Sequence, residues 1–482
     1  MKKRSRPHIV LITLDECKAS ALGCYGNRDA YTPMMDKLAS QGTLFREAYC
    51  TFPKCVPSRA ALMTGRYPHV EGHRTLPGFE VRRGENHLVQ ELKRAGYKTA
   101  MFGKNHTIEP EWMEEMFDEC RRARKGADVP WARRESEEDD DLFRAFYRGA
   151  FSDVHGMSDH HATQDALSFM ERHRDSEDPF FLLVNYNAPH PPYTDIPPFI
   201  DLIRERKIAL PRIEPLDEAP ELLRAYREVY DLEHLSAAQW RQVVEAYYGL
   251  VAFVDDLVGQ LVDGVEACGL AEDTVVVVTS DHGDFAGEHG CVEKWDTLFY
   301  DCMVKVPLII RYPGHVRAGR TTEAMTDNVD VAPTLLELAG LEVPDWMQGR
   351  SLGDVLTGKT DTHKDAVFCE GGVEEAALSR TVGLDTEAHR QRHPNYHWKQ
   401  ELIVRHPWSI HRAKMIRTRD WKLVYRLSGV KELYNLREDP GEYCDVAALP
   451  EHREVIADLM ERLLQWTIRT ETDYPRIETM YS

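Results

Sequence analysis

Five apolar, β-branched segments recur along the chain and constrain its fold more than any other feature. They read HIVLITL, YKTAMFG, PFFLLVNYN, TVVVVTSD and VPLIIRYP and occupy residues 8–14, 97–103, 179–187, 274–281 and 306–313. Such continuous runs are typical of strands buried on both faces of a parallel sheet. Helical patterns separate them, so the sequence predicts an α/β fold with a doubly wound, mostly parallel central sheet flanked by helices.

The pattern changes near residue 360. Short candidate strands follow, AVFCEG, AKMIRT, WKLVYR and KELYNL, and then a helical pattern near residues 449–468. We expect a smaller antiparallel sheet with one helix there. Because 482 residues exceed what one hydrophobic core usually supports, we place a large first domain at residues 1–360 and a C-terminal α+β subdomain at residues 361–482.

One polar segment interrupts the alternation of strands and helices. Residues 106–160 include the run RRESEEDDD at residues 133–141. We expect this segment to leave the central sheet, with its charges forming a solvated surface. A lid over a ligand site is the alternative interpretation.

The composition limits the classes of partner. A formal net charge of -20 argues against a protein that acts on nucleic acid or on an anionic membrane surface. The ten cysteines include no CxxC pair and do not resemble a disulfide framework. The apolar run after MKKRSRP is too short for a signal peptide or a membrane span, so we expect a cytoplasmic location.

Two of the expected strands end in acidic residues. LITL is followed by Asp15 and Glu16, and VVVVTS is followed by Asp281 and His282. Because ligands of doubly wound sheets bind beyond the carboxyl ends of the strands, we expect these side chains at one edge. Carboxylates and an imidazole suit a divalent cation such as Ca²⁺, Mg²⁺ or Mn²⁺. The alternative is that the acids cap the following turns, and Glu16 could point away from the cluster.

The stretch FPKCVPSRAALMTGR at residues 52–66 places a thiol where a loop becomes a helix. Pro57 suits the first turn of a helix. Backbone N–H groups at a helix start favour an anion and lower the pKa of a thiol, and Arg59 could supply a forked cation for a tetrahedral oxyanion. The residues alone therefore leave two interpretations of Cys55, a thiolate nucleophile and a simply buried side chain.

CVPSRAALMTGR resembles the signature C-x-P-S-R-x-x-x-[LM]-[TS]-G-R of the type I sulfatases, within the alkaline-phosphatase-like superfamily. Other segments resemble landmarks of that family in the same order: LITLDE, GCYGN, GYKTAMFGKNH, NAPHPPY, TSDHGDFAGEHG and WKLVYR with ELYNLREDPGE. The resemblance covers most of the chain. His282 stands where other members have asparagine, which is similar to the subgroup of iduronate-2-sulfatase, choline-sulfatase and phosphonate monoester hydrolase relatives.

The resemblance implies a sulfuric ester hydrolase that acts on a sulfated sugar or another small sulfate ester. It implies that a maturation enzyme oxidises Cys55 to formylglycine, whose hydrated aldehyde, a metal-bound gem-diol, is the nucleophile. Asp15, Asp281 and His282 would hold one divalent cation together with the modified Cys55, with calcium expected and magnesium or manganese as alternatives. Glu16 stands where many members have a second ligating aspartate, so its role stays open.

The resemblance also assigns roles around the sulfate. Arg59 would position the formylglycine, Lys104 and His106 would contact the diol and the sulfate, and Lys294 would reach another sulfate oxygen. His190 is the candidate acid that protonates the leaving alcohol. The alternatives are a surface role for either lysine and a structural loop role for His190.

Two further groups of residues are weaker candidates. His73 and Arg74, in EGHRTL, either face the substrate or make hydrogen bonds within a loop. His397, Trp398 and Lys399, in NYHWKQ, could line a specificity pocket from the second domain.

Three other functions compete with sulfate ester hydrolysis. A phosphonate monoester or phosphodiester hydrolase would use the same scaffold, but Lys104 and His106 favour sulfate, because the resemblance gives phosphonate hydrolases neutral hydroxyl residues in that segment. A thiol hydrolase would use unmodified Cys55. A non-catalytic anion-binding protein is the third, and the intact set of Cys55, Arg59, Lys104 and His190 argues against it.

Overall fold

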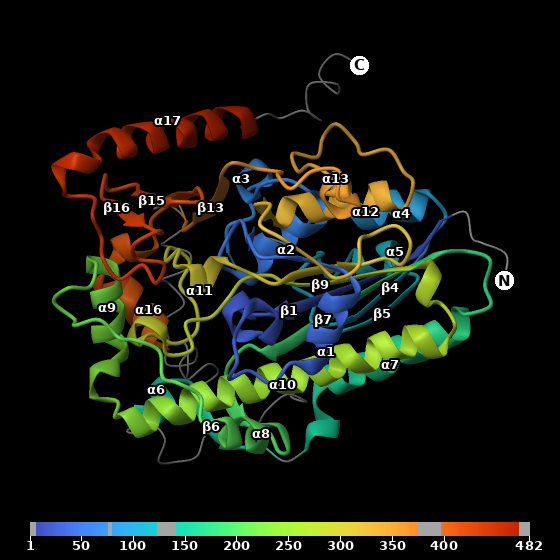
Figure 1. The fold of residues 1–482 in the computed structure, drawn as a ribbon, viewed down its shortest axis with the longest axis horizontal. Helices are drawn as coiled ribbons and strands as arrows, with labels where there is room; N and C mark the ends of the chain where they lie inside the picture. Colours follow the sequence, from blue (N-terminus) through green and yellow to red (C-terminus); the bar gives the residue numbers. More distant parts are fainter. Residues whose placement is uncertain (1–5, 76–79, 123–140, 152, 374–396, 472–482) are drawn as a thin grey trace.

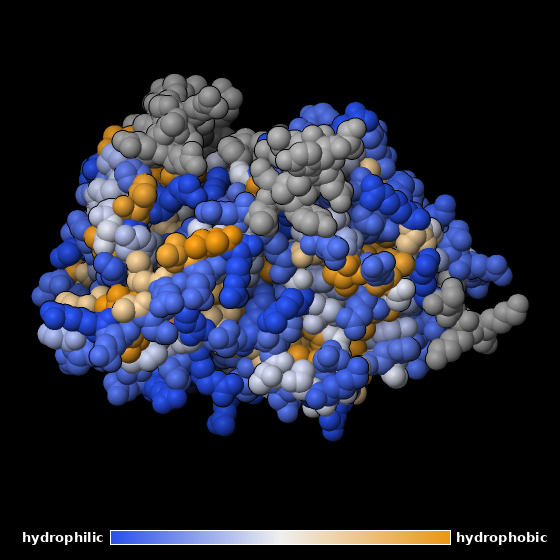
Figure 2. Space-filling view, turned by 90° about the horizontal axis from the view of Figure 1, so that it is seen from above, coloured by the Kyte–Doolittle hydropathy of each residue, from blue (hydrophilic) through white to orange (hydrophobic). Residues whose placement is uncertain are grey.

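The computed structural model describes residues 6–75, 80–122, 141–151, 153–373 and 397–471. Within these residues no helix combines the length and the apolar character needed to cross a membrane. Figure 2 shows one face of the molecule, on which hydrophilic residues predominate and hydrophobic residues lie in separate patches.

An eight-stranded sheet forms the centre of the molecule, in the order β11-β2-β10-β9-β1-β7-β4-β5. The strands β5, β4, β7, β1 and β9 run parallel to one another, which confirms the expected α/β fold. The strands span β1 His8–Asp15, β2 Thr43–Phe45, β4 Lys98–Gly103, β5 Glu119–Arg122, β7 Phe180–Pro189, β9 Thr274–Ser280, β10 Leu308–Arg311 and β11 Arg320–Thr322.

Helices cover both faces of this sheet (Figure 1). One face carries α1 (Pro33–Gln41), α7 (Ser158–His173) and α10 (Ala237–Ala267), and the other carries α2 (Cys55–Thr64), α4 (Leu88–Arg94), α12 (Val331–Leu338) and α13 (Gly353–Thr357). Alternate residues of β1 therefore enter different cores, with Val10 and Ile12 in one and Ile9 and Leu11 in the other. This two-sided burial explains why the strand sequences are continuously apolar.

The prediction that VPLIIRYP forms a parallel strand was wrong. β10 runs antiparallel to both of its neighbours, β9 and β2. The chain leaves β9 at the carboxyl edge, forms the loops that follow Ser280, and re-enters the sheet from the same edge. Because the connection begins and ends at the same edge, β10 runs in the opposite direction to β9. A parallel strand would need a crossover along one face of the sheet.

The prediction that residues 106–160 leave the sheet was also partly wrong. β5, within this segment, pairs parallel with β4 as the edge strand of the central sheet. β6 (Tyr147–Ala150) pairs with β8 (Tyr193–Asp195) in a separate two-stranded sheet. Most of the acidic run at residues 133–141 lies outside the described residues.

A four-stranded antiparallel sheet follows, in the order β13-β14-β15-β16, as expected. It comprises β13 (Val367–Gly371), β14 (Ala413–Arg417), β15 (Trp421–Arg426) and β16 (Lys431–Asn435), and α17 (Arg453–Thr470) packs on it through Leu459, Leu463 and Trp466. The same apolar cluster includes Ala61 of α2, so this sheet lies against the helix that begins at Cys55. The domain boundary at residue 360 stays a prediction.

The remaining elements connect these layers. They are β3 (Ala48–Tyr49), β12 (Thr326–Asp327), α3 (Pro68–Glu71), α5 (Met113–Met116), α6 (Asp141–Arg144), α8 (Phe199–Arg206), α9 (Glu221–Tyr230), α11 (Asp301–Val304) and α16 (His397–Arg405).

Candidate active site

The strand-end residues meet at one edge of the central sheet, as predicted. β1 ends at Asp15, and Asp281 follows the last residue of β9 directly. The parallel register places Leu14 beside Ser280, so the two acids leave the sheet side by side. The Asp281 carboxylate accepts hydrogen bonds from the backbone N–H groups of Glu16 at 3.2 Å and His282 at 2.8 Å.

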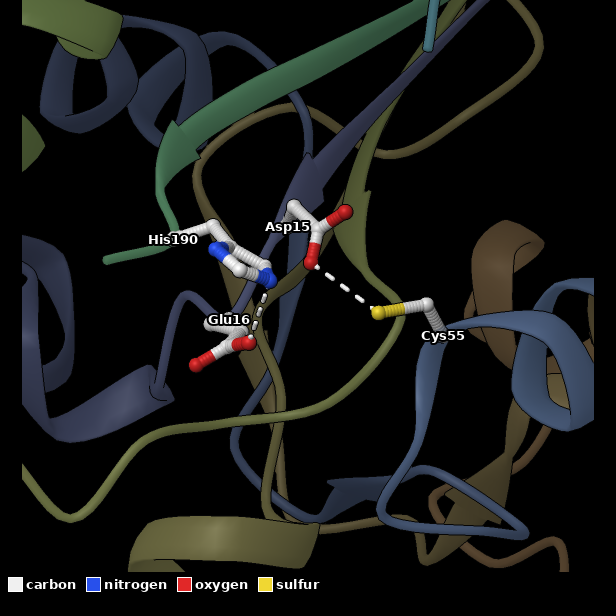
Figure 3. A group of neighbouring side chains, drawn as sticks. All are labelled: Asp15, Glu16, Cys55 and His190. Carbon is white, nitrogen blue, oxygen red and sulfur yellow. Dashed lines mark hydrogen bonds and ion pairs between the residues drawn. The ribbon is translucent and has the colours of Figure 1, made fainter. Parts of the chain in front are cut away.

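Cys55 is the first residue of α2 and points into this edge (Figure 3). Its Sγ atom lies 3.3 Å from Asp15 Oδ1 and 3.3 Å from His282 Nε2. The residue is only 1% exposed. The structure therefore brings the thiol against two of the predicted metal ligands.

Two cations neutralise the carboxylates. Arg59, one turn after Cys55, contacts Asp281 Oδ2 through Nε at 2.7 Å and Asp15 Oδ2 through Nη2 at 3.2 Å. Lys104 Nζ lies 2.6 Å from Asp15 Oδ2. Burial alone would raise the pKa of Asp15, but Lys104 and Arg59 outweigh it and hold the pKa well below its usual range.

The donor atoms fit a divalent cation. Asp15, Cys55, Asp281 and His282 each offer one ligand atom, and these atoms all lie within 4.8 Å of one another. Burial would lower the pKa of His282, but Asp281 and Cys55 beside it raise the pKa to about 10. The neighbouring groups thus favour a protonated, positively charged ring. A bound cation would take the place of the added proton.

Glu16 belongs to the same cluster. Its backbone is in the left-handed region, with φ 66°, which is uncommon for a residue other than glycine and is often found at functional sites. Its Oε1 lies 3.1 Å from His190 Nε2 and forms an ion pair with Lys294 (Figure 3 shows the contact with His190). Burial raises the pKa of Glu16 well above its usual value. Its ligation of a metal stays a prediction.

Lys294 is surrounded by acceptors. Besides Glu16, its ammonium group contacts Glu293 Oε1 at 2.9 Å and His190 Nε2 at 3.2 Å. The other ring nitrogen of His190 lies 2.5 Å from the carbonyl oxygen of Pro191. Burial, followed by the charge of Lys294, lowers the pKa of His190 well below its usual value. His190 is therefore neutral here, with Nδ1–H donating to Pro191 and Nε2 accepting from Lys294.

His106 lies near Lys104 and Asp15, whose charges act on its ring. Burial and the charge of Lys104 lower its pKa to about 3. Its Nδ1 atom is buried and has no hydrogen-bond partner among the described residues. A neutral imidazole with an unused nitrogen is consistent with a contact to a bound molecule, and this role stays a prediction.

The five weaker candidates lie in different surroundings. Trp398 is buried in the core, with the His397 ring against it. Arg74 Nη1 contacts Glu370 Oε2 of strand β13 at 2.6 Å, which ties its loop to the C-terminal sheet. His73 Nε2 lies 3.2 Å from Glu85 Oε2, so a structural role is favoured for both. Lys399, on α16, forms an ion pair with Glu293. Glu293 was missed by the sequence interpretation, although its position directly before Lys294 in GEHGCVEKW was a usable signal.

Comparisons with known proteins place the chain among proteins of one family. A family model described as Sulfatase matches residues 7–341. An N-acetylglucosamine-6-O-sulfatase of Bacteroides thetaiotaomicron is 27% identical, over 96% of this chain and 86% of its own length.

Solved structures share the fold. One, a protein in complex with its substrate D-glucosamine-2-N,6-O-disulfate, has a TM-score of 0.75 at 24% identity and covers 97% of this chain and 99% of its own. A phosphonate monoester hydrolase from Silicibacter pomeroyi has a TM-score of 0.75 at 22% identity and covers 96% of each chain.

Proposed function

The chain belongs to the sulfatase family, and on that premise we propose that it hydrolyses a sulfate monoester of a sugar or another small molecule with formylglycine at position 55 as its nucleophile. The observation that carries the proposal is the position of Cys55, at the first turn of α2 and 3.3 Å from both Asp15 and His282. A thiol that served only to fill the core would have no reason to lie among buried carboxylates and an imidazole.

A divalent cation would be held by Asp15, Asp281 and His282 together with residue 55, and when bound it would acidify a hydroxyl group and offset the charge of the sulfate. The donor set, two carboxylates and one imidazole, suits calcium, magnesium or manganese. Arg59 bridges Asp15 and Asp281 and so fixes the two carboxylates relative to helix α2.

The chain's own residues divide the reaction into two steps. One hydroxyl oxygen of hydrated formylglycine attacks sulfur, and the bond between sulfur and the alcohol oxygen breaks. The second hydroxyl then loses its proton, the carbon–oxygen bond to the sulfate breaks, sulfate leaves and the aldehyde is restored. One water adds to the aldehyde and regenerates the hydrated form for the next turnover. Lys104 pairs with Asp15 and Lys294 pairs with Glu16, and from these positions their ammonium groups can stabilise the sulfate oxygens.

The leaving alcohol needs a proton, and we assign its delivery to Nε2 of His190. In the structure this nitrogen accepts from Lys294 Nζ at 3.2 Å, so the lysine is a source of the proton. An arriving sulfate adds negative charge beside the ring and favours the protonated form. His190 is partly exposed, with 14% of its side chain accessible, as a group that meets the substrate must be.

The relatives suggest the substrate class. One acts, by its name, on the 6-O-sulfate of N-acetylglucosamine, and one of the solved structures holds a disulfated glucosamine. We therefore place a sulfated sugar first among the candidate substrates. A net charge of -20 makes the local cluster of cations essential for attracting such an anion.

The proposal is tested on protein produced together with a formylglycine-generating maturation enzyme. Intact mass spectrometry should show a loss of roughly 18 Da when the thiol becomes an aldehyde, or almost no change when the aldehyde is hydrated. Sulfate release is then measured on aryl sulfate, choline sulfate and 2-O-, 4-O- and 6-O-sulfated sugars. A thiol that stayed fully alkylatable in active enzyme would refute the formylglycine mechanism.

Phosphonate monoester hydrolysis is the second candidate, because a phosphonate monoester hydrolase shares the fold over 96% of this chain. Lys104, paired with Asp15, favours sulfate. Rates on matched aryl sulfate and aryl phosphonate esters separate the two functions. A higher rate on the phosphonate, or no activity on any sulfate ester despite full modification, would reverse our choice.

A further inference from the structure

Helix α16 brings a lysine of the C-terminal part of the chain to the edge of the site. The helix is anchored by the buried side chains of Trp398, Leu402 and Ile403 and lies beside α9 (Figure 1). The guanidinium carbon of Arg144 lies 5.2 Å from the centre of the Trp398 ring, which fixes the start of the helix further. Lys399 follows Trp398 directly, so its backbone position is set by this packing.

Lys399 pairs with Glu293. Glu293 in turn contacts Lys294, to which we assign a sulfate oxygen. The Lys399 ammonium forms an ion pair with Glu293 Oε2. Glu293 Oε1 lies 2.9 Å from Lys294 Nζ, and Oε2 accepts from the backbone N–H of Lys294 at 2.8 Å. The side chain of Lys399 is 18% exposed, whereas those of Glu293 and Lys294 are 0% and 3% exposed, so the two inner residues are almost fully buried.

The backbone at Glu293 is held in place for this role. Its φ is 57°, in the left-handed region, and its N–H donates to Tyr193 Oη at 2.8 Å. Burial alone would raise the pKa of Glu293, yet Lys294 and Lys399 hold it well below its usual range, so the carboxylate is ionised between two ammonium groups.

We propose that Lys399 is a positioning residue for sulfate hydrolysis, which balances the charge of Glu293 so that Lys294 is available to the sulfate. The inference rests on the proposed function. Lys294 has three ammonium protons and three acceptors around it, Glu16, Glu293 and His190. To contact a sulfate oxygen it must loosen at least one of these contacts.

Two buried carboxylates compete with the sulfate for Lys294, and Lys399 weakens one of them. With both lysines present, the single negative charge of Glu293 is shared between two positive charges. Without Lys399, Lys294 would be the ammonium group of the described residues that still contacts the buried Glu293. The attraction between these two would strengthen, because a buried ionised carboxylate needs a partner. Lys294 would then be withheld from the substrate.

A double-mutant cycle tests this charge balance on the full-length, modified and metal-loaded protein. The variants are K399M, E293Q, K399M/E293Q and K399R. We measure kcat/KM on the sulfate ester that the wild type cleaves fastest, and the binding of inorganic sulfate by calorimetry. Sulfate binding does not depend on turnover, so it separates a failure of this inference from a failure of the proposed function.

We expect K399M to lower kcat/KM and sulfate affinity by about 10-fold to 100-fold, less than the loss of a whole donor would cost. K399R keeps the charge and should remain within about threefold of the wild type. The double variant K399M/E293Q should be more active than K399M, because removal of the carboxylate releases Lys294. A purely structural role of Lys399 would lower the free energy of unfolding without changing the sulfate affinity of the folded protein.

K414M is the matched control. Lys414 is a similarly accessible lysine of the C-terminal sheet, with 21% of its side chain exposed, and it faces the buried Glu370. We expect its kcat/KM to match the wild type. If K399M does not fold, K399Q replaces it in the cycle. The inference is overturned if the Lys399 variant keeps kcat/KM and sulfate affinity within twofold of the wild type. It is also overturned if the fold-loss of K399M/E293Q equals the product of the fold-losses of K399M and E293Q.

Discussion

The molecule contains two clusters of buried charge that are built in different ways. In the C-terminal cluster, Lys422 Nζ lies 2.7 Å from Asp301 Oδ1 and also contacts Glu442, while Arg417 Nη2 lies 3.1 Å from Asp301 Oδ2. Each charge there faces an opposite charge. Such closed pairs are expected when buried ions serve only the fold.

The strand-end cluster, around Asp15 and Asp281, has a different composition. Arg59 and Lys104 neutralise the carboxylates, but a thiol and an imidazole also lie against them, from Cys55 and His282. Ligand atoms therefore converge on one point instead of pairing off. The comparison teaches that buried charge alone does not indicate a functional site, whereas convergent donors with a nucleophile do.

The largest expected effect is a loss of activity at Cys55, which we propose as the precursor of the nucleophile. We expect C55A to lose turnover of the sulfate ester by about 10⁴-fold or more, since removal of a nucleophile leaves only binding and electrostatic effects. Sulfate release under single-substrate conditions measures this. The thermal unfolding midpoint should stay near that of the wild type, and a variant with a tenth of the wild-type rate would contradict the assignment.

Substitution within the C-terminal cluster should affect stability instead. K422M would leave Glu442 and Asp301 with fewer cations in a site where Lys422 is 0% exposed. We expect the free energy of unfolding to fall by about 3–5 kcal/mol, as when one partner of a buried pair is removed. Denaturant unfolding measures it. The kcat/KM of the folded fraction should not change, and a large loss there would mean that the two clusters are coupled.

K104M is the counterpart in the strand-end cluster. Lys104 is partly exposed, at 11% of its side chain, and contacts Asp15. We expect kcat/KM to fall by about 10²–10³-fold, the usual cost of losing a donor to transition-state charge. Steady-state kinetics measure the loss. A large change in unfolding free energy without a change in kcat/KM would mean that Lys104, like Lys422, serves stability and not catalysis.

His87 provides a third case, a buried titratable group that belongs to neither cluster. Its ring nitrogens have no hydrogen-bond partners among the described residues, and burial lowers its pKa to about 3. Because the unfolded chain binds a proton near pH 6.5 and the folded one does not, stability is lost as pH falls from about 6.5 toward 3. Between pH 7 and pH 5 the expected loss is about 2 kcal/mol.

H87F should remove this pH dependence, because phenylalanine cannot bind a proton and keeps the ring that packs edge-on to Trp112 at 5.0 Å. Unfolding free energies of the wild type and H87F at pH 7 and pH 5 measure the difference. H234F, at a histidine with 74% of its side chain exposed, is the control and should follow the wild type. Equal pH dependence in wild type and H87F would contradict the buried neutral state.

The sequence predicted the central sheet and the strand-end residues because both follow from local patterns. Asp15 and Asp281 come directly after buried strands, and parallel strands end at the same edge. The direction of β10 could not be predicted in this way, since a strand buried on both faces has the same apolar sequence in either direction. β5 was missed because ECRR is a polar, half-exposed edge strand.

The contact between Lys399 and Glu293 could not be predicted from sequence for another reason. It depends on how α16 packs beside α9, with Trp398 and Leu402 buried, and no local sequence pattern encodes the partner of a packed helix. The family resemblance supplied the individual site residues, and it is confirmed. It did not supply Glu293, which contacts both Lys294 and Lys399.

The burial of Cys55 bears on whether the proposed modification comes before or after folding. Only 1% of the residue is accessible in the folded chain, so another enzyme cannot bind this segment once α2 has packed. Conversion to formylglycine would therefore have to precede folding, and every chain that folds first would be permanently inactive. The specific activity of a preparation would then depend on the rate of modification relative to the rate of folding during synthesis. Slower folding would yield a larger fraction of active enzyme.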